Sequence, residues 1–482
     1  MSHTPAARQG EQAPGRDAPT AEPSGIGWPV WRLAWVIVFG AFASGLDASI
    51  ANIGLDTIRA DLHAGLAQAQ WVSSGYLLAL AASLPACAWL GRKIGTGRLW
   101  LAALAAFTAA SGWCAAAPSI TVLILLRAVQ GLAAGLLIPA GQTVLGQAVG
   151  AARLGRVMAT LGIAVSLAPA LGPVTGGLVL NWLSWRWLFL INLPVGIAGL
   201  ALGLRVVPRG KTGAAGRLDW RGFAAIGTGL PMLVYALTRW GAAGTPAAGS
   251  VLIPLVLGAG SLVLFVRHAR RQQNPLLDLR LFRSRVYAAA SAAACCAGAL
   301  MFGTALLYPL YFQILHHDDT VTTGLQLLSL GGGTALALPL TGRLTDRHGG
   351  GIVAVCGALA AVAATVPFAI LPAHPDPVLV QILLALLGMA IGFAAVPAGI
   401  VAYKTVRPTQ LADATSQVNI LQRLGGSLGG AIFAVVLAHG LPGGPGHAFR
   451  VAFCCQAATA LAALACALWL WLVSPRGTGV RR

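Results

Sequence analysis

Long apolar segments, separated by short polar breaks, run along most of this chain. An α-helix needs about 20 apolar residues to cross a hydrocarbon layer of about 30 Å. Fourteen segments meet this description, and we expect each to be a membrane-spanning helix. They cover residues 31–54, 70–90, 99–117, 119–142, 157–180, 186–206, 220–238, 250–267, 286–310, 323–342, 351–371, 378–402, 416–438 and 451–473.

The overall composition agrees with a membrane protein. Of the 482 residues, 57% are hydrophobic and only 9% are charged, a balance that the surface of a water-soluble protein does not allow. The eight cysteines all lie in apolar segments, without the spacing of metal ligands or of a disulfide framework. We therefore predict an all-α integral membrane protein in which the cysteines are packing residues.

The distribution of basic residues predicts the orientation in the membrane. With an even number of crossings both termini lie on one side, and 26 of the 32 Lys and Arg residues fall in the tails and loops of that side. Loops rich in Lys and Arg remain in the cytoplasm. We therefore expect a multi-pass protein of the plasma (inner) membrane with cytoplasmic termini. The net charge of +19 then reflects orientation and attraction to membrane lipids, and no nucleic-acid partner is expected.

The two longest cytoplasmic connections flank the seventh and eighth predicted helices and divide the chain into halves. A short repeat supports this division, because the sequence from Ala88 to Gly95 resembles that from Gly342 to Gly349. Paired halves around a central cavity are the usual construction of secondary transporters. The predicted domains are a disordered cytoplasmic tail at 1–29, a six-helix bundle at 30–206, two extra helices with their connections at 207–285, a second six-helix bundle at 286–473 and a cytoplasmic tail at 474–482.

Asp47 is the sole acidic residue well inside a predicted helix. An ionised carboxylate at that depth costs several kcal/mol unless it is paired, protonated or facing water. The functional interpretation is a carboxylate that takes up and releases a proton as a cavity opens to each side. The alternative is a structural aspartate that forms hydrogen bonds near a helix end.

Four further polar residues of the predicted helices are candidates for the same cavity. Arg127 lies at nearly the depth of Asp47, and Gln130 shares its helix face. Arg127 can pair with Asp47, or it can bond to backbone carbonyls of a neighbouring helix. In the thirteenth helix, Arg423 and the nearby Asn419 either line the cavity or extend toward the membrane surface, and the sequence does not decide between these.

The fifth predicted helix carries a seam of small residues and prolines. Small residues let helices approach closely. The functional interpretation is a hinge or seal that controls leakage, and the alternative is ordinary close packing. The residues assigned to it are Gly162, Pro169, Gly172, Pro173, Gly176 and Gly177.

Charged residues at the cytoplasmic ends of the second and tenth predicted helices are candidates for a gate. Asp346 and Arg347 can bond to neighbouring helix ends and latch one conformation, or they can lie in a solvated loop. The residues assigned to this gate are Gly342, Asp346, Arg347, Gly349, Arg92 and Lys93.

Other chemistry is not expected from this sequence. The adjacent residues from His316 to Asp319 are interpreted as a solvated loop, since neighbours in sequence rarely converge on one metal ion. No phosphate-binding glycine loop is present, so we expect an ion gradient to drive transport without a cofactor. Clustered catalytic groups of an enzyme are also missing from the pattern.

These residues belong to patterns that resemble the fourteen-helix drug:proton antiporter branch of the major facilitator superfamily, over nearly all of residues 30–475. The resemblance implies two six-helix bundles plus two extra central helices, proton coupling through the fourth-helix pattern and an antiporter signature in the fifth helix. The first-helix pattern adds Asn52 to the cavity residues. The similar patterns are Leu46–Leu55, Arg127–Gly131, Gly172–Gly177, Trp185–Pro194 and Pro275–Phe282.

The first cytoplasmic loop departs from this family pattern, which normally reads G-x-L-x-D-R-x-G. Ala88 replaces its first glycine, and Arg92 stands at the position of the aspartate, whereas the second copy with Asp346 is intact. Asp56 also stands where the family usually has proline. The reversed charge at Arg92 removes an acid thought to latch the N-terminal half in such proteins.

The function expected from these features is export by alternating access. Asp47 would take a proton from outside, and substrate binding would accompany proton release to the cytoplasm. A single embedded acid favours small lipophilic substrates that are neutral or monocationic, handled by a monomer. The alternative is a proton-coupled uptake symporter for a small solute, which would need more polar groups in the cavity.

Overall fold

The computed structural model describes residues 26–150, 153–210, 212–213, 216–243, 249–272, 275–372 and 375–474, so most of the two predicted tails lies outside it. Within these residues every regular element is a helix. The first nine are α1 (Trp28–Ile53), α2 (Leu55–Asp61), α3 (Leu66–Ser83), α4 (Ala86–Ile94), α5 (Thr96–Ala115), α6 (Ile120–Val149), α7 (Leu154–Trp182), α8 (Trp187–Leu190) and α9 (Asn192–Val206). The others are α10 (Trp220–Ala243), α11 (Gly249–Arg271), α12 (Arg285–Leu310), α13 (Thr320–His348), α14 (Gly350–Ile370), α15 (Pro377–Lys404), α16 (Leu411–Gly440) and α17 (Pro445–Val473), with short turns η1 (Leu279–Arg283), η2 (Tyr311–Leu315), η3 (Pro408–Gln410) and η4 (Leu441–Gly443).

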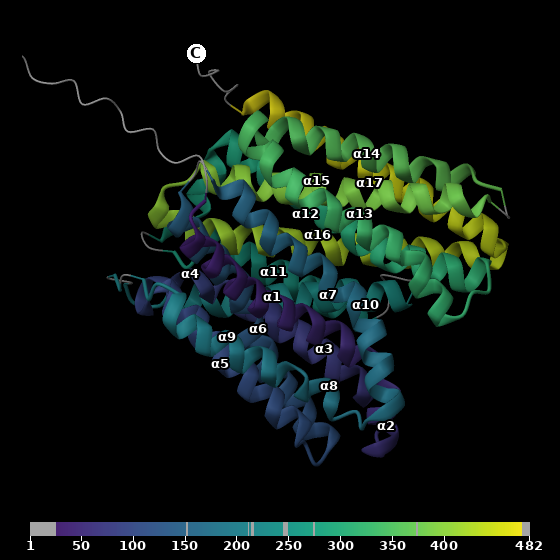
Figure 1. Ribbon diagram of the computed structural model, residues 1–482, viewed down its shortest axis with the longest axis horizontal. Coiled ribbons are helices and arrows are strands. Elements are labelled where there is room, and N and C mark those ends of the chain that lie inside the picture. The colour runs from purple at the N-terminus through teal and green to yellow at the C-terminus, as the bar shows by residue number, and fades with distance from the viewer. Residues whose placement is uncertain are drawn as a thin grey trace, which may run out of the picture.

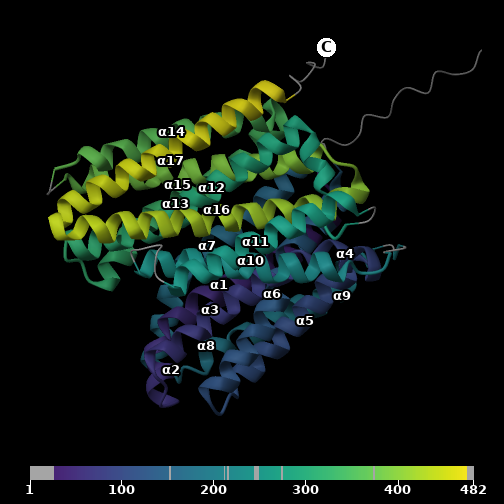
Figure 2. The same cartoon turned by 180° about the vertical axis from the view of Figure 1, so that it is seen from behind.

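The helices form two groups that lie side by side (Figures 1 and 2). One group contains α1 to α9 and the other contains α12 to α17. The pair α10 and α11 lies beside them, and α10 contacts α3 of the first group and α16 of the second. Between the groups, α7 packs on α13 and α15, and α6 packs on α16. The domain boundaries given above stay predictions.

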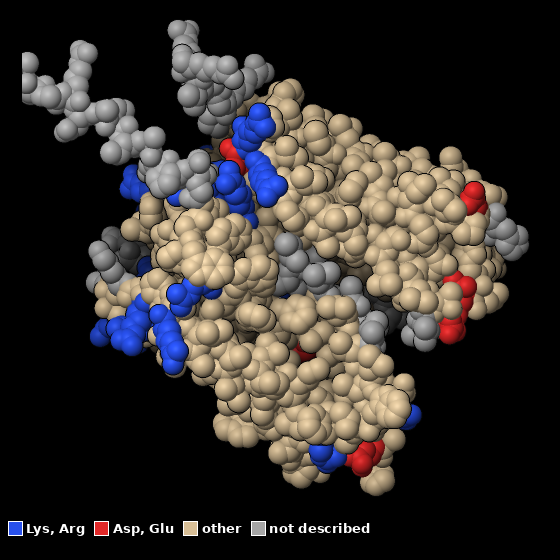
Figure 3. Space-filling model, in the orientation of Figure 1, with Lys and Arg blue, Asp and Glu red and all other residues tan. Residues whose placement is uncertain are grey.

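The two groups converge at one end and diverge toward the other (Figure 1). In the same orientation, Lys and Arg gather at the converging end of the visible face (Figure 3). We call this the basic end, and it is the end that the sequence predicts to face the cytoplasm. The contacts that close it are therefore candidates for the predicted gate.

Each of the fourteen predicted segments falls on one of these helices or on a broken pair of them. The second segment is divided into α3 and α4, which meet at a bend of 58°. Pro85 lies at this break, where its ring and missing N–H interrupt the helix. The sixth segment is divided into α8 and α9 at Ile191.

The number of membrane crossings is not settled by helix length and composition. Among the described residues, nine helices are long and apolar enough to cross a membrane, or ten if α3 and α4 count as one span. An all-helical membrane architecture is thus confirmed, while fourteen crossings stay a prediction.

The internal repeat found in the sequence is also a repeat of backbone conformation. Gly95 follows α4 with φ of +92°, and Gly349 follows α13 with φ of +88°. Both values lie in a region that side chains other than glycine rarely adopt. Gly349 follows Gly95 by 254 residues, the offset of the repeated motif, so the two halves end their second helix in the same way.

The same offset recurs where helices cross closely. A Cβ atom on Gly131 of α6 would collide with the carbonyl oxygen of Tyr76 on α3. A Cβ atom on Gly388 of α15 would collide with the carbonyl oxygen of Leu330 on α13. Leu330 follows Tyr76 by 254 residues, so equivalent crossings in the two groups both depend on glycine.

We predict that replacing a glycine at the crossing of α13 and α15 by alanine is destabilising. In Gly333→Ala, the new Cβ would meet the carbonyl oxygen of Ala385 on α15, whereas the matched control Gly332→Ala has no neighbour within 4 Å. Gly333→Ala should lower the free energy of unfolding by about 1–3 kcal/mol because the crossing is overpacked. Gly332→Ala should be neutral or slightly stabilising. Thermal unfolding of the purified proteins in detergent measures both, and equal shifts would contradict the packing described.

Candidate functional site

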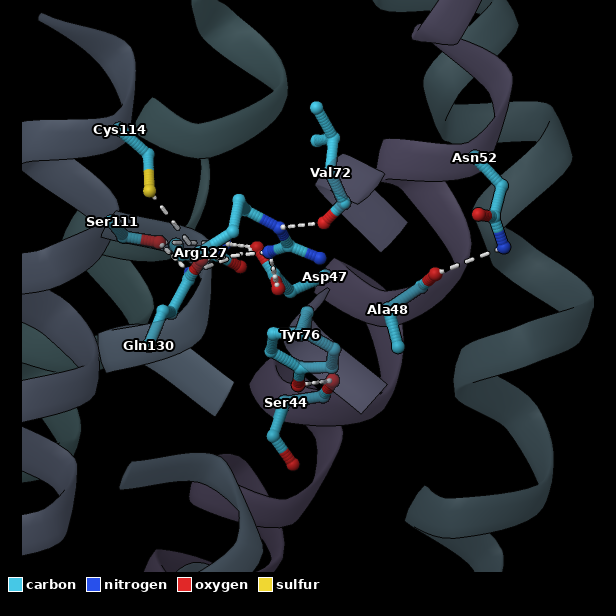
Figure 4. Close-up of polar contacts among 11 residues, drawn as sticks. Ser44, Asp47, Ala48, Asn52, Val72, Tyr76, Ser111, Cys114, Arg127 and Gln130 are labelled. Atoms are coloured by element: carbon cyan, nitrogen blue, oxygen red, sulfur yellow. Dashed lines mark hydrogen bonds and ion pairs between the residues drawn. The ribbon is translucent and has the colours of Figure 1, made fainter. Parts of the chain in front are cut away.

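Asp47, Arg127 and Gln130 form a buried cluster in the first group of helices (Figure 4). The side chains of Asp47 and Arg127 are each 1% exposed, and the Arg127 Nη1 atom lies 2.5 Å from Asp47 Oδ2. Gln130 Nε2 donates to the other carboxylate oxygen at 3.0 Å, and Arg127 Nη1 also donates to Gln130 Oε1 at 2.7 Å. The structure therefore brings together the three residues that the sequence placed at a similar depth.

Two further residues complete the shell around the carboxylate and were not assigned to the site from the sequence. Asn192 Nδ2 donates to Asp47 Oδ1 at 2.8 Å and to Ser111 Oγ at 3.0 Å. Gln130 Nε2 also donates to Ser111 Oγ at 2.6 Å. The sequence signal for Asn192 was its place in the Trp185–Pro194 pattern, whereas Ser111 is a lone hydroxyl in an apolar segment. The break at Ile191 makes Asn192 the first residue of α9 and lets it reach the carboxylate.

The guanidinium of Arg127 is held from other sides as well. Its Nε atom donates to the carbonyl oxygen of Val72 at 3.2 Å, so both interpretations of Arg127 are realised at once. The ring centre of Tyr76 lies 4.1 Å from the guanidinium carbon, and that of Phe189 lies 5.6 Å away. The Tyr76 hydroxyl donates to the Ser44 carbonyl at 3.1 Å. These aromatic faces stabilise a cation and exclude water from the pair.

This arrangement favours an ionised pair and makes it expensive to disturb. Removing one partner of a buried ion pair typically costs about 3–5 kcal/mol because the other charge is left unpaired. Protonation of Asp47 would likewise leave Arg127 without its counter-charge. The ion pair therefore holds α1 and α6 together at this point.

The second group of helices contains a neutral counterpart of this cluster. Thr304 follows the first residue of α12 by 19 positions, as Asp47 does in α1. Gln456 of α17 donates to the Thr304 hydroxyl at 2.8 Å, as Asn192 of α9 donates to Asp47. The hydrogen-bonded geometry is thus repeated without the carboxylate.

The counterparts of the remaining cluster residues are apolar. Leu384 follows the first residue of α15 by seven positions, as Arg127 does in α6. Leu387 corresponds in the same way to Gln130, and both leucines are fully buried. At these equivalent described positions the second group therefore has no charged residue.

Asp346 joins the two groups at the basic end. Its carboxylate accepts hydrogen bonds from the backbone N–H groups of Gly155 and Arg156, both at 3.1 Å. These lie in the first turn of α7, where a helix has free N–H groups and favours negative charge. Lys404 Nζ of α15 also donates to Asp346, at 3.0 Å.

Arg92 makes the corresponding link on the other side of the interface. Its Nη1 atom lies 2.7 Å from Asp413 Oδ2 in the first turn of α16, with side-chain exposures of 33% and 8%. The first loop therefore contributes the base of this ion pair, and the facing helix contributes the acid. Asp413 was not assigned from the sequence because a single acid near a helix start has no distinguishing pattern.

Neutral hydrogen bonds close the interface beside these charges. Asn419 Nδ2 donates to Gln142 Oε1 of α6 at 2.7 Å, and the Tyr403 hydroxyl reaches the same oxygen at 3.3 Å. The hydroxyls of Thr143 and Thr415 hydrogen-bond to each other at 2.9 Å. Asn419 therefore contributes to the contacts at the basic end, and its hydrogen bonds among the described residues do not include the Asp47 cluster.

Several residues assigned from the sequence lie apart from these contacts. Asn52 is exposed, and its side chain donates to the Ala48 carbonyl of its own helix, at 3.3 Å (Figure 4). The Lys93 ammonium lies 4.7 Å from the ring centre of Trp89. Arg347 is exposed, with no ion pair to the part of the chain that the structure describes.

The glycines of α7 pack against both groups. A Cβ atom on Gly162 would lie 3.1 Å from Leu338 of α13, and one on Gly172 would lie 2.5 Å from Ser49 Cβ of α1. Gly342 of α13 packs in turn on the start of α7, where its Cβ atom would lie 2.8 Å from the Gly155 carbonyl. This helix is therefore in close contact with both halves, as a hinge or seal requires.

The remaining residues of the predicted hinge are less informative. Gly176 faces Ile53 of α1, whereas a Cβ atom on Gly177 would meet nothing within 4 Å. The side chains of Pro169 and Pro173 lie outside the described residues. The functional role of this seam stays a prediction.

The Trp185–Pro194 pattern also has a contact beyond the membrane-spanning segments. Trp185 Nε1 donates to Asp61 Oδ2 at 2.7 Å, and Arg186 Nη1 lies 3.1 Å from the same oxygen. The hydrogen bonds from Trp185 and Arg186 hold the pKa of Asp61 below its usual value. This contact ties the α2–α3 connection to the start of α8.

Known proteins resemble this chain along most of its length. The sequence profile of the Major Facilitator Superfamily matches residues 37–430 and, in a second match, 322–482. A multidrug resistance protein B homolog of Mycobacterium tuberculosis (strain ATCC 25618 / H37Rv) is 34% identical over 417 residues, covering 85% of this chain and 76% of the relative. A putative multidrug resistance protein MdtD of Cronobacter sakazakii is 31% identical over 343 residues, covering 70% and 71%.

Solved structures share the fold at low sequence identity. The human organic anion transporter MFSD10 matches with a TM-score of 0.65 and 14% identity, covering 92% of this chain and 100% of that one. The proton:xylose symporter XylE matches with a TM-score of 0.65 and 13% identity, covering 92% and 96%. The chain therefore belongs to the Major Facilitator Superfamily and is a multi-pass membrane protein with that family's all-helical fold.

Proposed function

We propose that this protein is a proton-coupled antiporter that exports small lipophilic molecules, such as drugs, antibiotics or metabolites, by alternating access. It would have fourteen membrane-spanning helices, with both termini in the cytoplasm and the plasma (inner) membrane as its location. The names of its relatives, which include multidrug resistance proteins, support the substrate class. The proton gradient would supply the driving force, and neither a cofactor nor a chemical reaction is involved.

The observation that carries this proposal is the buried pair of Asp47 and Arg127. In a protein without catalytic machinery, a charged pair at this depth is costly and marks an ion pathway or substrate pathway. A proton that reaches Asp47 would neutralise the carboxylate and free Arg127. The hydrogen bonds that tie α1 to α6 and α9 would then rearrange, which would let these helices move.

The contacts at the basic end supply the second part of the cycle. With this end in the cytoplasm, the arrangement corresponds to a state closed toward the cytoplasm. The links made by Asp346 and Asp413 would hold this state, and the close packing around Gly162 and Gly172 of α7 would seal it. Opening toward the cytoplasm would require these links to break together.

We predict that Asp47→Asn abolishes proton coupling. Acid-loaded everted vesicles would receive a panel of lipophilic drugs, and proton efflux would be followed with a pH-sensitive dye. Substrates should collapse the pH gradient with the unmodified protein and should do so at least about tenfold more slowly with Asp47→Asn, because the amide cannot exchange a proton. Asp56→Asn is the matched control, since Asp56 is an exposed acid of α2 and its loss should leave proton efflux unchanged.

The result that would sink this proposal is substrate-driven proton efflux of equal rate in Asp47→Asn. Drug resistance or drug export without any proton movement in the unmodified protein would also contradict it, and would point to another coupling ion. Substrate accumulation in the opposite direction would indicate an uptake symporter.

We also predict that the ion pair between Arg92 and Asp413 at the basic end still forms when the two charges are exchanged. Arg92→Asp would place two acids together, which should disfavour the closed state by about 1–3 kcal/mol, or roughly a factor of 5 to 150 in population. Adding Asp413→Arg should restore it. Spin labels on the exposed residues Arg98 and Arg407, in a background freed of native cysteines, would report the separation of the two groups at this end. A distance that stays the same in all variants would exclude a latching role.

A further inference from the structure

Arg423 is a cation in the middle of α16. It follows the first residue of the helix, Leu411, by twelve positions, which is about 18 Å along the axis. The side chain is partly exposed. Neither a hydrogen bond nor an ion pair joins it to any of the residues that the structure describes. More than three helical turns separate it from the start of α16.

The helix face that carries Arg423 is turned toward the first group of helices. Asn419, one turn nearer the basic end, lies on the same face and hydrogen-bonds to Gln142 of α6. Arg423 therefore lies between the two groups, one turn beyond the contacts that close the basic end.

The other buried charges of this interface and of the first group are balanced. Arg127 is paired with Asp47, Arg92 with Asp413, and Lys404 with Asp346. Arg423 is the charge without a counter-ion among the described residues of this region. An unpaired guanidinium in a membrane interior is costly unless water or an anion solvates it.

This balance changes the expected charge of the substrate. The sequence favours neutral or monocationic molecules because Asp47 is the one embedded acid. In the structure that carboxylate already accepts an ion pair from Arg127 and hydrogen bonds from Gln130 and Asn192. It therefore offers no free negative charge to a cation, whereas Arg423 offers a free positive charge to an anion.

We propose that Arg423 binds an acidic group on the transported molecule, so that the preferred substrates are small lipophilic carboxylates with a single negative charge. This inference rests on the proposed export function. The planar guanidinium presents paired N–H donors that match the two oxygens of a carboxylate.

The test compares three probes of the same size and apolarity that differ in charge: pyrenebutyrate, pyrenebutyramide and pyrenebutylamine. Binding to the full chain in nanodiscs is followed by energy transfer from tryptophan to pyrene, with empty nanodiscs as the background. The unmodified protein should bind the carboxylate at least about tenfold more tightly than the amide, and the amine most weakly. Arg423→Gln should remove this preference while binding of the neutral amide changes little. Arg423→Lys should keep part of it, since the charge remains while the paired N–H donors of the guanidinium are lost.

Arg450→Gln is the matched control, because Arg450 is an exposed cation of α17 and its loss should leave all three affinities unchanged. Equal affinity of the unmodified protein for the three probes, or a preference for the amine, overturns the inference. Carboxylate binding that survives Arg423→Gln overturns it as well, provided that the variant has the elution profile of the unmodified protein. The binding assay uses no proton gradient. If binding depends on Arg423 but the protein moves no protons in the vesicle assay, only the proposed antiport is refuted.

Discussion

The ion pair between Asp47 and Arg127 constrains how the helices of the first group pack around it. Two charges removed from water need each other, and they also need partners for every remaining donor and acceptor. Amide and hydroxyl groups from α5, α6 and α9 supply those partners, and aromatic rings from α3 and α8 cover the guanidinium. Helices that are far apart in the sequence therefore meet at this ion pair. A change of charge there alters a contact of each of them.

The comparison of the two groups shows how a repeated scaffold divides its tasks. Backbone features recur in both, including the glycine that ends the second helix and the glycine crossings. The charges do not recur, because Thr304, Leu384 and Leu387 occupy the positions of Asp47, Arg127 and Gln130. The second group instead carries Arg423 on the face turned toward its partner. Proton-linked and substrate-linked groups would thus lie on opposite sides of the surface that moves during transport.

Much of this arrangement could be predicted from the sequence because hydrophobicity reports membrane burial directly. Helix positions, the depth of Asp47 and its pairing with Arg127 follow from counting residues. Ser111 and Asn192 could not be found in this way, since neutral polar side chains barely disturb an apolar pattern. The partner of Arg92 was equally hidden, because Asp413 is 321 residues away and only the folded chain brings them together.

The ion pair between Arg92 and Asp413 bears on how signature motifs are read. A pattern search that requires an acid in the first loop would score this chain as defective, although an electrostatic link is present, with the base on the loop and the acid on α16. The other link, made by Asp346, uses backbone N–H groups, which no substitution of a side chain can invert. A motif residue that binds backbone groups should therefore keep its identity during evolution. A motif residue that binds a side chain can change when its partner changes with it.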